Sequence, residues 1–342
     1  MRRRPAHITV AGQGLPYSKG LMASSIMAAG LSPTQAFEAA ERIERILTEK
    51  RRDGISRKDL RDLCASVLAG IDQRYAAQYL KWQAVEELDV PLVIMLGGAT
   101  GVGKSTIATQ LAARLGITRV ISTDAIREVL RAAFSQQLMP ALYVSSFQAD
   151  EALRVPLPAS VDQLILGFQE QVSAVSVGIK ALIARALEEG TDIIVEGAHV
   201  VPGFLEGWDK EFEEAILVPV VITLSDEDLH RSNFERRSFD APSRRPRDRY
   251  LSGFDKIRSI QSYIRLLAQE RGVPVLELSD LDSALQEIAG IVVAKALEKA
   301  EARGDIESQV PPSFELTDEG EFVARKPRSR VKRWEALGSR RR

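Results

Sequence analysis

Cysteine, histidine and long apolar runs are scarce in this sequence. Its 342 residues include a single cysteine and three histidines. One cysteine cannot form a disulfide within the chain, which excludes a disulfide-stapled fold and fits a reducing compartment. No run approaches the roughly 20 apolar residues that a membrane-spanning helix requires, and Arg2–Arg4 precede no apolar stretch of signal-peptide length. We therefore expect a cytoplasmic protein without a membrane span.

An excess of charge of either sign is also missing. Lys and Arg number 46 and Asp and Glu number 47, so the formal net charge is −1. The overall charge therefore selects neither nucleic acids nor membrane surfaces, and any anion-binding site must come from a local cluster of basic residues. Hydrophobic residues make up 45% of the chain, which is ordinary for a globular protein, and the length predicts two folded domains.

Residues 1–89 have the apolar spacing of helices and form the first predicted domain. The segment Ser32–Gln35 offers an N-cap serine, a proline at the first helical position and a glutamine at the third, which together predict a helix start. Ser56 opens another helix, whose apolar face includes Cys64. We expect Cys64 to be a buried core residue. His7–Val10 is the one strand that this part of the sequence predicts.

Residues 90–303 alternate short apolar runs with amphipathic helices and form the second predicted domain. This alternation is typical of an α/β fold in which β-α-β units build a parallel sheet covered by helices on both faces. Pro219 is expected at the start of its strand, because a proline inside a central strand would lose a ladder hydrogen bond. Five strands are predicted: Leu92–Leu96, Arg119–Ser122, Asp192–Glu196, Val220–Leu224 and Pro274–Leu278.

Residues 304–342 lose this periodicity and form a basic tail that we expect to be disordered. Between Arg325 and Arg342 there are nine Lys or Arg residues and one acidic residue, Glu335. One interpretation is a tail that is simply solvated. The alternative is an electrostatic contact with nucleic acid or another polyanion.

A glycine-rich loop follows the first predicted strand directly. Residues 98–105 match the pattern G-x-x-x-x-G-K-[ST], with the strand before and the helix after that a phosphate-binding P-loop requires. The glycines allow consecutive N–H groups to point at one anion in front of the positive end of the helix. Lys104 would contact the β- and γ-phosphates of ATP, and the Ser105 hydroxyl would bind Mg²⁺. The predicted nucleotide-binding residues are Gly98, Ala99, Thr100, Gly101, Val102, Gly103, Lys104, Ser105 and Thr106.

The loop alone does not distinguish hydrolysis of ATP from transfer to an acceptor. Asp124 follows the second predicted strand, and Arg127 lies three residues later on the first helical turn. A kinase needs such a pair, because the carboxylate orients or deprotonates the attacking hydroxyl and the guanidinium holds an anionic acceptor or the transferring phosphoryl group. We therefore predict that both residues, together with Lys104, are catalytic and that both bind substrate. The alternative is that Asp124 only caps its helix.

Glu196 ends the third predicted strand, at the position of a Walker B carboxylate. We predict that Glu196 holds a Mg²⁺-bound water or an acceptor hydroxyl, the alternative being a helix cap or a buried hydrogen bond. His199, three residues later, is a candidate contact for the acceptor phosphate, and a structural role is the alternative for this lone histidine. Glu196 and His199 thus belong to the predicted substrate site, and Ser105 and Glu196 form the predicted metal site.

The segment that follows the fourth predicted strand is rich in arginine. In kinases of this architecture such a segment is a lid that closes over the nucleotide, excludes water and adds positive charge against the transition state. Arg236 and Arg237 are the predicted catalytic arginines, and the alternative is that these arginines lie on a solvated helix face. The arginines of this segment are Arg231, Arg236, Arg237, Arg244, Arg245, Arg247 and Arg249.

Several segments together resemble the 2-phosphoglycerate kinase family. Many families share the phosphate loop, whereas the Glu-Gly-x-His-x-x-Pro-Gly and Arg-Tyr…Ile-Gln-x-Tyr segments are more specific. The resemblance covers about residues 7–300. The segments that carry it are Gly98–Ser105, Ser122–Arg127, Glu196–Gly203 and Arg249–Tyr263.

The resemblance implies an ATP-dependent kinase that converts 2-phosphoglycerate to 2,3-bisphosphoglycerate with Mg²⁺. It also implies a P-loop kinase sheet of strand order 2-3-1-4-5 and an N-terminal domain similar to an ATP-cone, which Pro16–Leu21 and Met27–Leu31 resemble. The chemistry of the chain agrees with such an acceptor. A phosphate and a carboxylate around one hydroxyl need several cations near Asp124, which Arg127, Arg131 and the lid supply.

Two other functions remain open on the residues alone. One keeps the kinase but changes the acceptor to a polynucleotide 5′ end, a sugar or an inositol phosphate, because an Asp-x-x-Arg after the second strand does not separate these acceptors. The other is a regulatory protein in which ATP binding controls partner contacts of the N-terminal domain or the basic tail.

Overall fold

The computed structural model describes ten segments of the chain, and it divides the chain into two compact units. One unit comprises residues 1–84 and 306–342, and the other comprises residues 85–305. The described residues are 9–10, 18–49, 54–86, 88, 90–154, 158, 160–240, 247–303, 314–316 and 322–324.

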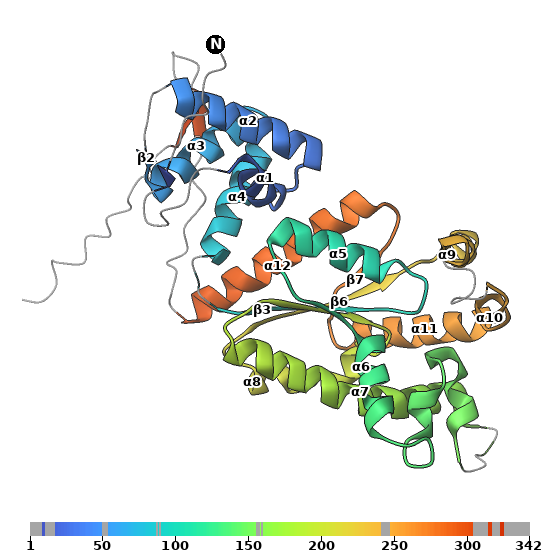
Figure 1. Cartoon of the computed structure of the whole chain (residues 1–342). Helices are drawn as coiled ribbons and strands as arrows, with labels where there is room; N and C mark the ends of the chain where they lie inside the picture. Colours follow the sequence, from blue (N-terminus) through green and yellow to red (C-terminus); the bar gives the residue numbers. More distant parts are fainter. Residues whose placement is uncertain are drawn as a thin grey trace, which may run out of the picture. The chain divides into compact units, whose positions relative to one another are not determined.

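The N-terminal unit is mainly helical (Figure 1). Ser32 and Gln35 form the predicted capping box: the Gln35 N–H donates to Ser32 Oγ at 3.3 Å, and the Ser32 N–H donates to Gln35 Oε1 at 3.1 Å. Ser56 Oγ accepts from the Asp59 N–H at 3.0 Å, which confirms the second predicted helix start. The helices are α1 (Lys19–Met27), α2 (Pro33–Glu49), α3 (Arg57–Ala69) and α4 (Gln73–Glu86), and the paired parallel strands are β1 (Thr9–Val10) and β2 (Gly54–Ile55).

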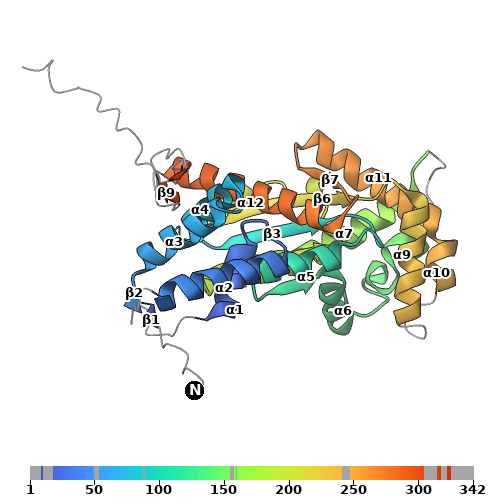
Figure 2. The same ribbon diagram turned by 90° about the horizontal axis from the view of Figure 1, so that it is seen from above.

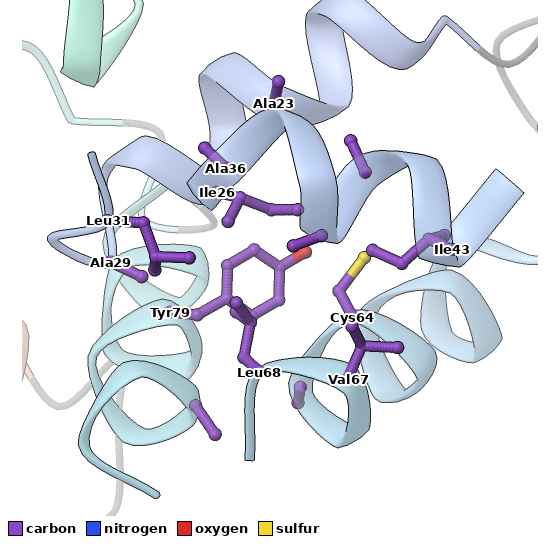
Figure 3. Close-up of a cluster of buried hydrophobic side chains, with 14 of the residues drawn as sticks. Ala23, Ile26, Ala29, Leu31, Ala36, Ile43, Cys64, Val67, Leu68 and Tyr79 are labelled. Carbon is purple, nitrogen blue, oxygen red and sulfur yellow. The ribbon is translucent and has the colours of Figure 1, made fainter. Parts of the chain in front are cut away.

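Cys64 lies in the core of this unit, as predicted. Its side chain is fully buried beside Ile43 and Tyr79 (Figure 3), and its S–H donates to Met22 Sδ at 3.3 Å. Burial raises the pKa of the Cys64 thiol to about 12, so the thiol stays protonated at neutral pH and is a poor nucleophile. The strand β2 was not predicted, because two residues are too few to show a period. The likeness of this unit to an ATP-cone stays a prediction.

The second unit contains one parallel sheet of five strands, in the order β4-β5-β3-β6-β7. In chain order this is 2-3-1-4-5, so the predicted P-loop kinase topology is confirmed. The carboxyl ends of all five strands therefore meet at one edge. The strands are β3 (Leu92–Gly97), β4 (Val120–Ser122), β5 (Ile193–Gly197), β6 (Ile216–Thr223) and β7 (Val275–Glu277).

Helices cover both faces of this sheet (Figure 1). The helices α5 (Lys104–Leu115) and α12 (Leu281–Arg303) lie on one face, and α7 (Gln163–Glu188) and α11 (Phe254–Glu270) lie on the other. The remaining elements are α6 (Thr123–Ala133), η1 (Pro140–Tyr143), η2 (Ser146–Ala152), η3 (Pro202–Phe204), α8 (Trp208–Glu211), α9 (Glu227–Asp240) and α10 (Arg247–Ser252).

The alternation of side chains on β5 decides which face each residue meets. Ile193 and Val195 pack in one apolar cluster with Val175 and Ile179 of α7. Because successive strand residues point to opposite faces, Glu196 points to the face on which α5 begins. The register places Glu196 between Leu96 of β3 and Ser122 of β4, so the starts of α5 and α6 are its neighbours.

Pro219 corrects one prediction about the fourth strand. The strand β6 begins at Ile216, so Pro219 lies inside it rather than at its start. Pro219 is opposite Met95 of β3, whereas β7 pairs with β6 only from Val221 onward. A proline is tolerated here because one side of β6 has no ladder partner at this position.

Within the segment predicted to be a disordered tail, the structure describes two short antiparallel strands, β8 (Phe314–Leu316) and β9 (Phe322–Ala324). The basic stretch from Arg325 to Arg342 lies outside the described residues. Among the helices that the structure describes, none has the length and apolar character needed to cross a membrane.

Candidate active site

The loop between β3 and α5 has the backbone that a phosphate cradle requires. Gly98, Gly101 and Gly103 have φ angles of 138°, 92° and 92°, which side chains other than hydrogen rarely permit. A Cβ atom at Gly98 would lie 2.3 Å from the Ile222 carbonyl oxygen, and one at Gly101 would lie 2.4 Å from the Phe234 ring. Space and conformation therefore both require glycine at these two positions.

Lys104 and Ser105 are the first two residues of α5. The Lys104 ammonium group is buried and donates to the Ala99 carbonyl oxygen at 2.6 Å, so it lies across the loop. Ser105 Oγ donates to Glu196 Oε1 at 2.9 Å. The predicted buried hydrogen bond of Glu196 thus exists, and its partner is the other predicted metal ligand.

Asp124 lies at the start of α6, beside this pair. The N-cap of α6 is Ser122, whose Oγ accepts from the Ala125 N–H at 3.1 Å. The alternative that Asp124 caps the helix is therefore wrong. Its side chain is 72% exposed and its Oδ1 lies 3.6 Å from Arg127 Nη2, so the carboxylate is accessible at the edge of the sheet.

Arg127 is largely buried and retains hydrogen-bonding capacity. Its Nη1 donates to the Val144 carbonyl oxygen at 3.0 Å, which fixes the guanidinium plane. Its Nε is buried and has no hydrogen-bond partner among the described residues, and the same holds for Arg131 Nε, one turn later on α6. A buried guanidinium with an unused donor suits an anionic ligand. The predicted Asp124–Arg127 pair is therefore present on one helical turn.

His199 does not occupy the predicted position of a substrate contact. Its ring is 1% exposed; Nδ1 lies 2.8 Å from Thr123 Oγ1, and Nε2 lies 2.9 Å from Gln171 Oε1. Burial, with Arg127 and Lys104 nearby and against the opposing charge of Asp124, lowers the pKa of His199 to about 4. A neutral ring with both nitrogens bonded to protein has no atom left for an acceptor phosphate.

The helix α9 holds the phosphate loop by two contacts that the sequence did not predict. His230 Nε2 lies 2.8 Å from the Thr100 carbonyl oxygen, and Asn233 Nδ2 donates to the Gly101 carbonyl oxygen at 2.9 Å. His230 and Asn233 are three residues apart and thus share one helix face. Their spacing of three residues is the sequence signal for a shared helix face. It lies in an arginine-rich segment, for which the sequence predicts a role for the charged side chains instead.

Of the two predicted catalytic lid arginines, Arg236 has a described side chain and Arg237 does not. The Arg236 side chain is exposed, and its Nη2 donates to Asn233 Oδ1 at 2.8 Å. Arg236 also lines a pocket of about 510 Å³ beside the loop. The side chain of Arg237 lies outside the described residues. The pocket is lined by Gly101, Gly103, Thr106, Leu224, Leu229, Asn233, Arg236, Leu278, Ser279, Asp280 and Leu281.

The connection from β6 to α9 is fixed by α11 and β7. Gln261 accepts from the Leu224 N–H at 3.2 Å and donates to the Leu224 carbonyl oxygen at 3.1 Å. Arg258 Nη2 donates to the Ser225 carbonyl oxygen at 3.2 Å, and Glu277 accepts from the Ser225 N–H. Hydrogen bonds from Ser225 and Thr223 and the charge of Arg258 lower the pKa of Glu277 against its desolvation. Gln261 of the Ile-Gln-x-Tyr segment and Arg258, one turn earlier on α11, thus hold the base of the lid.

Arg249 of α10 reaches the segment that also binds Arg127. Its Nη2 donates to Ser145 Oγ at 2.6 Å and to Gln148 Oε1 at 2.9 Å. Arg127 and Arg249 therefore donate to consecutive residues, Val144 and Ser145. Figures 1 and 2 both place α9 and α10 beyond the same end of the sheet. The sequence predicts Arg249 as one of the lid arginines, without its partners Ser145 and Gln148.

The chain is similar in sequence to known proteins. The family model described as an AAA domain matches residues 93–257. The chain is 40% identical to a 2-phosphoglycerate kinase of Methanothermobacter thermautotrophicus over 84% of this chain and 92% of that one. It is 39% identical to a 2-phosphoglycerate kinase of Pyrococcus horikoshii over 85% of this chain and 94% of that one.

Among solved structures, shikimate kinase of Acinetobacter baumannii aligns with a TM-score of 0.36 at 15% identity, over 61% of this chain and 97% of that one. A likeness of this size adds nothing to the assignment, which follows from the sequence relatives. Their identity and coverage extend over both units rather than the phosphate loop alone. The chain belongs to the 2-phosphoglycerate kinase family.

Proposed function

We propose that this protein is a kinase that transfers the γ-phosphoryl group of ATP to the 3-hydroxyl of 2-phosphoglycerate. The observation that carries the proposal is the placement of Asp124 and Arg127 at the strand end next to the phosphate loop. A hydrolase needs only a positioned water, whereas this pair suits a hydroxyl that carries an anionic group. The names of the relatives support 2-phosphoglycerate as the acceptor.

The nucleotide is proposed to bind with its phosphates in the loop and its base in the neighbouring pocket. The N–H groups of the loop and the N-terminus of α5 favour the phosphates, and Lys104 would exchange its Ala99 contact for the β- and γ-phosphates. The pocket of about 510 Å³ has apolar walls from Leu229 and Leu278 and is large enough for an adenosine. Arg236 lines this pocket and would face the phosphates.

Mg²⁺ is the metal that we propose for this site. A serine hydroxyl and a carboxylate are hard oxygen donors, and the 2.9 Å contact between Ser105 Oγ and Glu196 Oε1 brings them to one point. Ser105 would bind the ion directly and Glu196 would hold one of its waters. When bound, the ion neutralises charge that builds up on the β- and γ-phosphate oxygens.

The acceptor is proposed to bind between α6, α10 and the segment 144–148. Arg127, with its unused Nε donor, would hold the phosphate or the carboxylate of 2-phosphoglycerate, and Arg249 would hold the other group. Asp124 would accept the proton of the 3-hydroxyl as its oxygen attacks the γ-phosphorus. The bond from that phosphorus to the bridging β-γ oxygen breaks, and ADP leaves with that oxygen.

A coupled assay of ADP release, with and without 2-phosphoglycerate, tests this proposal. We expect release that depends on 2-phosphoglycerate and on Mg²⁺ and that yields one 2,3-bisphosphoglycerate per ADP. Equal release in both conditions would indicate an ATPase and overturn the proposal. Parallel reactions with gluconate, an inositol phosphate and a 5′-hydroxyl oligonucleotide test the other acceptors, and activity confined to one of these would change the substrate but keep the kinase.

A further inference from the structure

A chain of buried hydrogen bonds connects three separate parts of the second unit. Gln171 of α7 is fully buried, and its Nε2 donates to the carbonyl oxygens of Ala141 and Val144. Its Oε1 lies 2.9 Å from His199 Nε2 and must accept a hydrogen bond from the Nε2–H group, because an amide oxygen carries no hydrogen.

The tautomer of His199 follows from this contact. Since the neutral ring carries its proton on Nε2, its Nδ1 accepts from the Thr123 hydroxyl at 2.8 Å. Thr123 is fully buried and is the first residue of α6, directly before Asp124. A Cβ atom at Gly197, the last residue of β5, would lie 1.8 Å from Thr123 Oγ1, so the glycine also leaves room for this hydroxyl.

The other end of the chain leads to Arg127. The Val144 carbonyl oxygen that accepts from Gln171 at 3.0 Å also accepts from Arg127 Nη1 at 3.0 Å. Gln171 thus connects to the helix of the Asp124–Arg127 pair at two points. One runs through His199 to the start of the helix, and the other runs through Val144 to the guanidinium.

We propose that Gln171 is a positioning residue for phosphoryl transfer, which acts through His199 and the Val144 carbonyl to hold Asp124 and Arg127 at the acceptor. This inference rests on the proposed kinase function and adds a residue that touches neither ATP nor the acceptor. Because the Asp124 side chain is 72% exposed, its position depends on how the buried contacts of α6 hold that helix. A shift of about 1 Å in such a group can cost 10²-fold in rate.

The test uses Gln171→Leu, which keeps the size of the side chain and removes both hydrogen-bonding groups. We expect kcat/KM for the acceptor to fall by about 10²-fold, because Arg127 and Asp124 lose their fixed geometry. The Kd for ATP, measured with a non-hydrolysable analogue, should stay within about twofold, since the phosphate loop makes none of these contacts.

Gln169→Leu is the matched control. Gln169 lies on the same helix, but it donates to Tyr263 at 2.7 Å and takes no part in the hydrogen bonds between Gln171, His199 and Thr123. It should leave acceptor kinetics unchanged.

A second pair of variants distinguishes loss of the hydrogen bond from a folding defect: Thr123→Val removes the hydroxyl at nearly constant shape, whereas Thr123→Ser keeps it. We expect the valine variant to lose acceptor kcat/KM and the serine variant to regain most of it.

The double variant Thr123→Val, Gln171→Leu separates a shared role from two structural defects. If both residues act through His199, the loss in the double variant should be smaller than the product of the single losses. All variants are assayed below their melting temperatures, with the acceptor that the wild-type protein uses in the panel above.

The outcomes for the two proposals differ. If the wild-type protein uses another acceptor, the assignment of 2-phosphoglycerate as the substrate is overturned. The variants then still test the positioning role of Gln171 with that acceptor. A wild type that transfers to 2-phosphoglycerate, together with Gln171→Leu kinetics equal to those of Gln169→Leu, overturns the positioning role alone. A parallel loss of ATP affinity in Gln171→Leu would also overturn it. No acceptor-dependent turnover of the wild type overturns both.

Discussion

The nucleotide side and the acceptor side of the candidate active site are held by different kinds of contact. On the nucleotide side, glycine conformations shape the loop 98–105, and His230 and Asn233 of α9 bind its carbonyl oxygens. On the acceptor side, buried side chains distant in sequence fix α6, with Gln171 at their centre. The first depends on local spacing, and the second depends on the assembled fold.

This difference predicts two separable classes of defect. A substitution on the nucleotide side should weaken ATP binding and transfer together. A substitution on the acceptor side should reduce transfer while ATP binding is preserved, because α6 and the loop are fixed by separate contacts. The variants that follow divide these classes, beginning with the largest expected effect.

Lys104→Met should cause the largest loss, on the nucleotide side. The variant keeps the buried stem and removes the charge that would stabilise the transferring phosphoryl group, so kcat/KM for ATP should fall by about 10³-fold. Steady-state kinetics with varied ATP measures this. Lys295→Met, which removes an exposed lysine of α12, is the control, and equal losses in the two variants would contradict the assignment of Lys104.

Asp124→Asn should separate the two sides most cleanly. The amide cannot accept the proton of the acceptor hydroxyl, so kcat should fall by about 10²-fold or more. ATP affinity, measured by titration calorimetry, should change little. Turnover that remains at the wild-type level would remove Asp124 from the mechanism.

Glu196→Gln should act where the two sides meet. The amide keeps the contact with Ser105 but removes the charge that would hold a metal-bound water, so the Mg²⁺ concentration for half-maximal activity should rise by about 10-fold. Initial rates across a Mg²⁺ titration measure this. An unchanged Mg²⁺ requirement would leave Glu196 with a structural role.

Arg249→Ala should raise the KM of the acceptor by about 10-fold, as expected for the loss of one charged hydrogen bond. The KM of ATP should not change. Arg265→Ala, which removes an exposed arginine of α11, is the matched control. If the KM of ATP rises instead, Arg249 belongs to the nucleotide side and the comparison between the sides fails at this residue.

The smallest effect concerns pH. Burial lowers the pKa of His199 from 6.5 to about 4, so the unfolded chain takes up a proton before the folded chain does. The stability that the neutral ring contributes is present above pH 6.5 and is lost as the pH falls toward 4. Between pH 6.5 and 5.5 the free energy of unfolding should fall by about 1 kcal/mol more in the wild type than in His199→Gln.

Denaturant unfolding at the two pH values measures this difference. An equal fall in the wild type and in His199→Gln would show that folding does not lower the pKa of His199, and a smaller fall in the wild type would show that the folded ring is protonated. A neutral ring is what the acceptor side requires, because a protonated Nδ1 could not accept from Thr123.

The sequence could predict whatever depends on local spacing. The order of the sheet, the caps at Ser32 and Ser56 and the burial of Cys64 follow from periodicity, capping or family likeness, and the structure agrees. The phosphate loop and the Asp124–Arg127 turn also lie within short windows. The extent of β6 was mistaken because a proline in a strand is tolerated or not according to the length of its neighbour, which no local pattern encodes.

The contacts that distinguish the two sides could not be predicted in the same way. The role of His199 depends on Gln171, which is 28 residues earlier in the chain, and on Thr123, which is 76 residues earlier. Arg249 meets Ser145 across 104 residues. Such pairs are neighbours only after the sheet has brought its strand ends together, so a lone histidine or arginine in the sequence carries no sign of its partner.

The most direct measurement of the central claim is phosphorus NMR of the wild-type protein with ATP, Mg²⁺ and 2-phosphoglycerate. The account predicts that the γ-phosphate signal of ATP decreases while a second phosphomonoester signal, coupled to the C3 protons of the acceptor, grows at the same rate. Growth of inorganic phosphate alone, with the 2-phosphoglycerate signal unchanged, would contradict it.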